Sequence, residues 1–126
     1  MKLPRVKTNI QIRFSDIDVF GHVSNSVYSQ YFDIGRMHFT HELERLEKQP
    51  PLVVASIKMD MRKEIRYEDK VYVETWVSHI GTKSLTMAQN IFSNDELAAE
   101  GVVVMVGFDL ETRKAKALPR HWEISN

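Results

Sequence analysis

The 126-residue chain contains no cysteine, which excludes disulfide bonds, thiolate metal ligands and cysteine nucleophiles. It also lacks a surplus of either charge, because 17 Lys and Arg residues balance 17 Asp and Glu residues. A free-standing nucleic-acid-binding domain usually carries a basic surplus, so nucleic acid is not an expected partner. The sequence motifs of the serine-hydrolase elbow, the dinucleotide-binding loop and the P-loop are missing as well.

Long apolar runs are missing too. The longest, residues 101–108, is bounded by Glu100 and Asp109 and is far shorter than the roughly 20 residues of a membrane-spanning helix. Residues 1–10 contain basic side chains with no apolar run behind them, so no signal peptide is expected. The composition, 43% hydrophobic and 27% charged, is that of a globular protein. We therefore expect one cytoplasmic domain, residues 1–126, without membrane contact.

Periodicity in the first half of the chain predicts a strand followed by a long helix. Residues 6–14 alternate between apolar and polar side chains, which places Phe14 on the apolar face of a half-buried strand. The helix has candidate N-caps at residues 24–26 and ends before Pro50. Because glycine lowers helix propensity, a glycine at position 35 indicates that another element passes close by. The apolar stripe of the helix consists of Tyr28, Phe32, Gly35, Phe39, Leu43 and Leu46.

Four further strands are predicted from the patterns at residues 53–61, 71–80, 85–91 and 97–110. The centre of the last one, residues 102–106, is continuously apolar, which predicts that both of its faces are covered. Short connections favour antiparallel hairpins, so the expected fold class is α+β, with one helix against one sheet. A single helix cannot cover so long a sheet, and we therefore expect a homodimer or homotetramer.

The densest group of polar side chains lies between the first strand and the helix, at residues 13–28. It contains Asp16, Asp18, His22 and Asn25. The first N–H groups of a helix lack intrahelical partners and carry partial positive charge, so they could stabilise the oxyanion of an acyl transfer. A carboxylate opposite them could attack the carbonyl or deprotonate a water. Helix capping and an ion pair with a neighbouring arginine are the structural alternatives, but capping needs only one or two such side chains.

Residues 16–28 read D-x-D-x-x-G-H-V-x-N-x-x-Y and precede a long helix that contains Arg36. This stretch resembles the hotdog-fold acyl-CoA thioesterases of the 4-hydroxybenzoyl-CoA thioesterase type. The likeness continues through residues 65–76, the turn at residues 80–84 and the end of the last strand, residues 108–114. It implies a hotdog fold, in which a five-stranded antiparallel sheet wraps around one long helix. It also implies that two subunits pair their sheets edge to edge, with active sites at that interface.

The resemblance implies hydrolysis of an acyl-CoA thioester to a carboxylic acid and free coenzyme A, without a metal or cofactor. Asp18 occupies the position of the family's catalytic carboxylate, either as nucleophile or as general base for water. Backbone N–H groups of residues 21–25 would polarise the thioester carbonyl. Arg62 and Lys83 could also meet the phosphates of coenzyme A. The full set of candidate substrate-binding residues is Gly21, His22, Asn25, Tyr28, Arg62, Lys83 and Ser84.

Other functions stay open. The motif also resembles acyl-ACP thioesterases, although Phe20 stands where those enzymes usually carry asparagine. A hotdog hydratase would space its carboxylate and imidazole more widely than Asp18 and His22. A hotdog domain that binds an acyl thioester without turnover is a further alternative. His38 and His41 lack a third ligand at useful spacing, so no metal site is expected.

Overall fold

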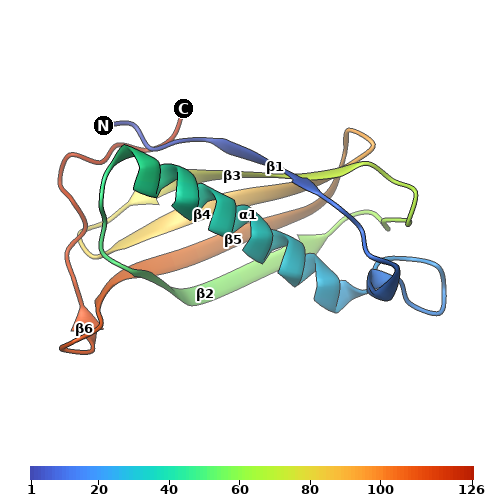
Figure 1. Cartoon of the computed structure of the whole chain (residues 1–126), viewed down its shortest axis with the longest axis horizontal. Coiled ribbons are helices and arrows are strands. Elements are labelled where there is room, and N and C mark those ends of the chain that lie inside the picture. The colour runs from blue at the N-terminus through green and yellow to red at the C-terminus, as the bar shows by residue number, and fades with distance from the viewer.

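A single long helix lies across one face of an antiparallel sheet in the computed structural model, which describes residues 1–126 (Figure 1). The predicted α+β class is therefore confirmed. The chain has no helix with the length and apolar character that a membrane crossing requires. In order, the elements are β1 (Val6–Ile10), the 3₁₀ turn η1 (Phe14–Asp16), α1 (Asn25–Leu46), β2 (Leu52–Met61), β3 (Val71–Ile80), β4 (Ser84–Ser93), β5 (Glu96–Asp109) and the short β6 (Lys114–Ala115).

The strand order is β1-β3-β4-β5-β2, and every neighbouring pair is antiparallel. β3, β4 and β5 follow one another as hairpins, in agreement with the short connections between them. In the β4–β5 turn, Asn94 and Asp95 adopt left-handed φ angles of 51° and 64°, which Asn and Asp tolerate better than most residues. β2 follows the helix and joins the sheet beside β5, which leaves β1 and β2 as the two edges.

The apolar stripe of α1 packs against the inner face of the sheet and divides the core into two groups of side chains. Near the N-terminal half of the helix, Phe32 belongs to a group that includes Ile91 of β4. Near the C-terminal half, Phe39 belongs to a group that includes Leu85 at the other end of β4. Each fully buried side chain of this size contributes about 1.5–3 kcal/mol. The buried positions of the helix are Val27, Tyr28, Tyr31, Phe32, Gly35, Arg36, Phe39 and Leu43.

The predicted close approach at Gly35 is confirmed. A Cβ atom there would lie 2.9 Å from Thr75 Oγ1, 2.9 Å from Val73 Cγ1 and 3.0 Å from Gln89 Nε2. The next residue, Arg36, is buried and donates to Gln89 Oε1 at 2.8 Å. Gln89 in turn donates to Thr75 Oγ1 at 3.0 Å. A small polar network thus lies between the two core groups and holds the helix over β3 and β4.

Three apolar residues depart from the predictions. β1 ends at Ile10, and Phe14 lies in η1 with 85% of its surface exposed, because the chain has already left the sheet. Leu46, in the last turn of α1, is exposed rather than part of the buried stripe. Val102 is 46% exposed, so one face of β5 is uncovered in this chain, contrary to the expectation for residues 102–106. The reason is that the only helix lies on the opposite face of the sheet.

The edge strand β2 leaves several apolar side chains uncovered. β2 pairs with β5 along one edge, and no strand pairs with its other edge. An edge with unpaired backbone groups and exposed apolar side chains is typical of a surface that meets another chain. The large apolar residues of β2 that are exposed are Val53, Val54, Ile57 and Met61.

Candidate active site

The loop between β1 and α1 is anchored by Asp16, whose surface is only 1% exposed. Its carboxylate accepts hydrogen bonds from the Arg13 backbone N–H at 2.9 Å, from Arg13 Nε at 2.9 Å and from the Tyr31 hydroxyl at 2.8 Å. Burial raises the pKa of Asp16, but the hydrogen bonds from Arg13 and Tyr31 outweigh burial and bring that pKa below its ordinary value. The first carboxylate of the D-x-D motif therefore serves the structure by tying η1 to the helix.

The second carboxylate, Asp18, closes the turn at residues 18–22. Its backbone N–H donates to the His22 carbonyl at 2.8 Å, and Gly21 adopts a φ of 82°, which suits glycine. Asp18 Oδ1 accepts from the backbone N–H groups of Phe20 at 2.9 Å and His22 at 3.2 Å. Asp18 Oδ2 makes no hydrogen bond within the chain, so this oxygen is available for chemistry.

The segment after β2, residues 62–66, forms the opposite wall of the site. The Val23 N–H donates to the Ile65 carbonyl at 2.7 Å. The Tyr28 hydroxyl, in the first turn of α1, donates to the Lys63 carbonyl at 2.8 Å. Burial raises the pKa of Tyr28, which favours the neutral hydroxyl that can donate this bond. These contacts hold the loop, the helix start and the end of β2 together.

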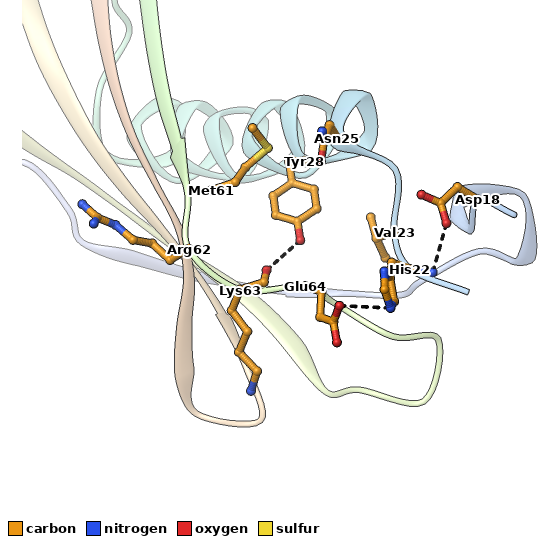
Figure 2. A pocket seen from close by; sticks show the side chains of 9 residues that line it. All are labelled: Asp18, His22, Val23, Asn25, Tyr28, Met61, Arg62, Lys63 and Glu64. Atoms are coloured by element: carbon orange, nitrogen blue, oxygen red, sulfur yellow. Dashed lines mark hydrogen bonds and ion pairs between the residues drawn. The ribbon is translucent and has the colours of Figure 1, made fainter. Parts of the chain in front are cut away.

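His22 and Glu64 form a contact across this gap. His22 Nε2 lies 3.0 Å from Glu64 Oε2, and the imidazole is 29% exposed (Figure 2). The other oxygen, Glu64 Oε1, accepts from Arg66 Nη2 at 3.1 Å. An isolated antiparallel bridge pairs the backbones of His22 and Arg66. The imidazole–carboxylate contact is therefore set by backbone pairing.

The N-terminus of α1 opens beside the loop. Ser24 is the N-cap residue, with φ −62° and ψ 145°, but its side chain makes no capping hydrogen bond. No acidic residue lies in the first turn. The first helical N–H groups, at residues 25–26, have no intrahelical acceptor. The positive end of the helix dipole thus remains available to an oxyanion.

A cavity of about 310 Å³ brings these groups together. This volume is at the lower end of the range for small-molecule sites. Asp18 lies at the rim of the cavity and is exposed, because no other part of the chain covers it. The residues that line the cavity are Asp18, His22, Val23, Asn25, Tyr28, Met61, Arg62, Lys63 and Glu64 (Figure 2).

The structure separates the predicted site residues into two places. Gly21 shapes the loop that carries Asp18 and His22 but does not line the cavity. Lys83 and Ser84 lie at the β3–β4 turn, at the opposite end of the sheet (Figure 1). Within one chain these two residues therefore do not reach the cavity. The predicted residues that do line it are Asp18, His22, Asn25, Tyr28 and Arg62.

The sequence patterns do not predict Glu64 as a site residue. A weak signal existed, because the run R-K-E at residues 62–64 directly follows a predicted strand. No local pattern shows that this strand end faces the loop at residues 18–22, since their contact depends on long-range pairing. Arg62 itself donates to Glu100 Oε2 at 2.6 Å, a hydrogen bond that raises the pKa of Arg62.

His38, on α1, contacts residues outside the cavity. His38 Nδ1 lies 2.8 Å from Thr8 Oγ1, and His38 Nε2 lies 3.7 Å from Glu42 Oε1. No group of three His, Asp or Glu side chains is arranged to hold a metal ion. The contacts of His38 are thus with β1 and with the next turn of α1.

Comparisons with known proteins connect this geometry to a family. The uncharacterized protein YsmA of Bacillus subtilis is 35% identical over 113 residues, which span 84% of this chain and 74% of YsmA. The acyl-CoA thioesterase YbgC of Haemophilus influenzae is 24% identical over 117 residues, which span 88% of this chain and 86% of YbgC. Both alignments include most of the chain, so the likeness is not confined to the site loop.

A solved structure of a thioesterase from Thermus thermophilus, complexed with coenzyme A and Zn, superposes with a TM-score of 0.79. The superposition includes 90% of this chain and 85% of the other, at 28% sequence identity. The predicted hotdog arrangement of one helix and an antiparallel sheet is therefore confirmed. The family model of the thioesterase-like superfamily matches residues 12–123, and the chain belongs to this superfamily.

Proposed function

We propose that the protein hydrolyses acyl-CoA thioesters to carboxylic acids and free coenzyme A, with Asp18 as the carboxylate that acts on the thioester. The observation that carries the proposal is the setting of this carboxylate. Its Oδ1 is held by two backbone N–H groups, its Oδ2 is open, and the cavity beside it includes the first residue of α1. The acyl-CoA thioesterase YbgC and the thioesterase complexed with coenzyme A support this substrate class.

In the proposed reaction, the thioester carbonyl oxygen lies at the uncapped N-terminus of α1. The helix N–H groups and the helix dipole stabilise the negative charge that develops on that oxygen. Asp18 Oδ2 then either attacks the carbonyl carbon, which gives a mixed anhydride and a thiolate, or takes a proton from an attacking water. Both routes consume one water and release one thiol, so thiol release measures either of them.

A homodimer completes the site in this proposal. The apolar edge strand β2 ends at the cavity with Met61, and pairing two β2 edges around a two-fold axis would cover the open side. An antiparallel edge pairing turns the opposite sheet end of the second copy toward this cavity. Lys83 and Ser84 lie at that end, where Lys83 can meet the phosphates of coenzyme A together with Arg62. A cytoplasmic location is part of the same proposal.

The experiment is a thiol-release assay with a panel of acyl-CoA thioesters of different chain length, including aromatic acyl groups and acyl carrier protein thioesters. We expect the wild type to release thiol from at least one acyl-CoA. Asp18→Asn and Asp18→Ala should lower kcat by about 10²-fold or more, because the reacting carboxylate is lost. Circular dichroism should show that both variants keep the native fold.

A matched control is Asp95→Asn, which makes the same chemical change at a residue of the β4–β5 turn that does not line the cavity. It should keep the wild-type kcat. Wild-type turnover by Asp18→Asn would refute the assignment of the carboxylate. Tight binding of acyl-CoA without any thiol release would refute the enzyme and favour a binding protein.

A further inference from the structure

The contact between His22 and Glu64 points to a second catalytic element beside Asp18. We infer that Glu64 is a positioning residue that holds His22 in one tautomer, and that His22 Nδ1 accepts the proton of the hydrolytic water. This inference rests on the proposed thioester hydrolysis and deepens it. It assigns the role of general base to His22 and leaves the role of nucleophile to Asp18.

Both ends of the Glu64 carboxylate are engaged, which fixes its orientation. Oε2 lies 3.0 Å from His22 Nε2, and Oε1 accepts from Arg66 Nη2 at 3.1 Å. The backbones of His22 and Arg66 form an antiparallel bridge, so the three side chains are brought together by main-chain pairing. Ion pairs this exposed contribute little to stability. The arrangement is therefore better explained by the orientation that it imposes on the imidazole.

The identity of the acceptor determines the tautomer. An ionised carboxylate can only accept hydrogen bonds, so the hydrogen in this contact belongs to His22 Nε2. A neutral imidazole carries one N–H, and Nδ1 is then an unprotonated acceptor. No hydrogen bond within the chain uses His22 Nδ1, and the side chain lines the same cavity as Asp18. The ring is thus held ready to take a proton from a molecule in the cavity.

The reaction balances when His22 is the base. Asp18 Oδ2 forms a bond to the thioester carbon and the C–S bond breaks, which gives a mixed anhydride and a thiolate. Water then attacks the anhydride, its proton passes to His22 Nδ1, and the C–O bond to Asp18 breaks, which frees the product acid. The imidazolium, stabilised by Glu64, returns its proton to the thiolate. With a base in place, Asp18 is free to serve as the nucleophile.

The test compares Glu64→Ala, Glu64→Gln and Glu64→Asp with the wild type and with Glu68→Gln. Glu68 is an exposed carboxylate on the same connection and does not line the cavity, so it is the matched control. Nitrogen NMR of the His22 ring should show the Nε2–H tautomer in the wild type and a tautomer mixture in Glu64→Ala. A steady-state assay should show kcat about 10- to 100-fold lower in Glu64→Ala, with KM within about twofold of wild type.

Glu64→Asp should recover part of kcat because it restores the acceptor, whereas Glu68→Gln should match the wild type. If Glu64→Ala does not fold, as judged by circular dichroism, Glu64→Gln replaces it in the kinetic test. Glutamine preserves the side-chain shape but lacks the negative charge that stabilises the imidazolium, so its kcat should also fall. Unchanged kcat in both Glu64→Ala and Glu64→Gln, or the same His22 tautomer in Glu64→Ala as in the wild type, would overturn the inference. Either result would leave the proposed function intact as long as Asp18→Asn loses turnover. Failure of this inference can therefore be distinguished from failure of the proposed function.

Discussion

Two aspartates that are two positions apart have different surroundings in the fold. Asp16 is buried, and its carboxylate is saturated by Arg13 and Tyr31. Asp18 is exposed, and only one of its oxygens is used, by backbone N–H groups of its own turn. A saturated, buried carboxylate holds structure, whereas a fixed carboxylate with one open oxygen can react. This difference in environment, rather than the residue type, is the reason why the proposed function assigns the reaction to Asp18 and not to Asp16.

We expect Asp16→Asn to destabilise the fold, because charge-assisted hydrogen bonds to Arg13 are lost. The expected loss in the free energy of unfolding is about 1.5–3 kcal/mol at pH 7. The pKa of Asp16 is lower in the folded state than its ordinary value of 3.8. The ionised carboxylate therefore stabilises the fold fully when the pH is above that ordinary pKa. This contribution is lost as the pH falls through the lower folded-state pKa.

Urea unfolding of the wild type and Asp16→Asn at pH 7 and in steps down to strongly acidic pH checks this prediction. The difference between the two proteins should shrink in the acid range, once Asp16 itself is protonated. Tyr31→Phe, which removes one of the hydrogen bonds and no charge, is the control and should cost less than Asp16→Asn at pH 7. A difference that stays constant with pH would show that the charge of Asp16 is not the stabilising feature.

At the residue scale, the site can be predicted only where its residues are neighbours in the sequence. The loop from Asp16 to Tyr28 is continuous, so its motif alone places Asp18, His22 and Asn25 near one another. Glu64 lies far along the chain, and its contact with His22 depends on an isolated backbone bridge. Local patterns carry no information on such pairing, which is why they do not predict Glu64.

At the scale of elements, the helix and the sheet meet most closely at Gly35. We expect Gly35→Ala to destabilise the protein by about 1–3 kcal/mol, because the new Cβ would press on Thr75 and Val73. Alanine favours a helix by about 1 kcal/mol relative to glycine. The measured loss in stability is therefore the cost of the steric clash minus this gain. Thermal and urea unfolding give the change in stability.

The control for this prediction is Glu44→Ala, at an exposed position of the same helix. With no neighbour to press on, this substitution should leave the free energy of unfolding within about 0.5 kcal/mol of wild type. If Gly35→Ala were as stable as Glu44→Ala, the close approach of α1 to β3 would not be limiting.

Element types are predictable because alternation and the three-to-four spacing of apolar residues are local signals. These signals place the helix and the four strands that follow it within a few residues of their observed ends. Pairing is not predictable in the same way. The alternation of residues 6–14 continues past Ile10, although the strand itself ends there. No local pattern indicates that β2 lies beside β5 at the edge of the sheet. Nor does one indicate that the side chain of Val102 is left exposed.

At the scale of the whole molecule, the uncovered apolar edge strand and the cavity lie next to each other. β2 is an unpaired edge, and its last residue, Met61, lines the cavity. The same strand carries exposed Ile57, directly opposite buried Val103 of β5. A second copy paired along β2 would cover both the edge and the open rim of the cavity. A substitution on β2 that prevents this pairing should therefore abolish both self-association and activity.

We expect Ile57→Lys to turn the proposed dimer into a monomer, because a charged side chain would have to lose its hydration at the paired edge. Ile34→Lys is a matched control, since Ile34 is 44% exposed on the outer face of α1 and Ile57 is 43% exposed on β2. Sedimentation or light scattering should show a monomer for Ile57→Lys and the wild-type mass for Ile34→Lys, while circular dichroism shows both folded. Thiol release should fall with the dimer in Ile57→Lys only. A monomeric wild type with full activity, or dissociation by Ile34→Lys instead, would contradict an active site completed across β2.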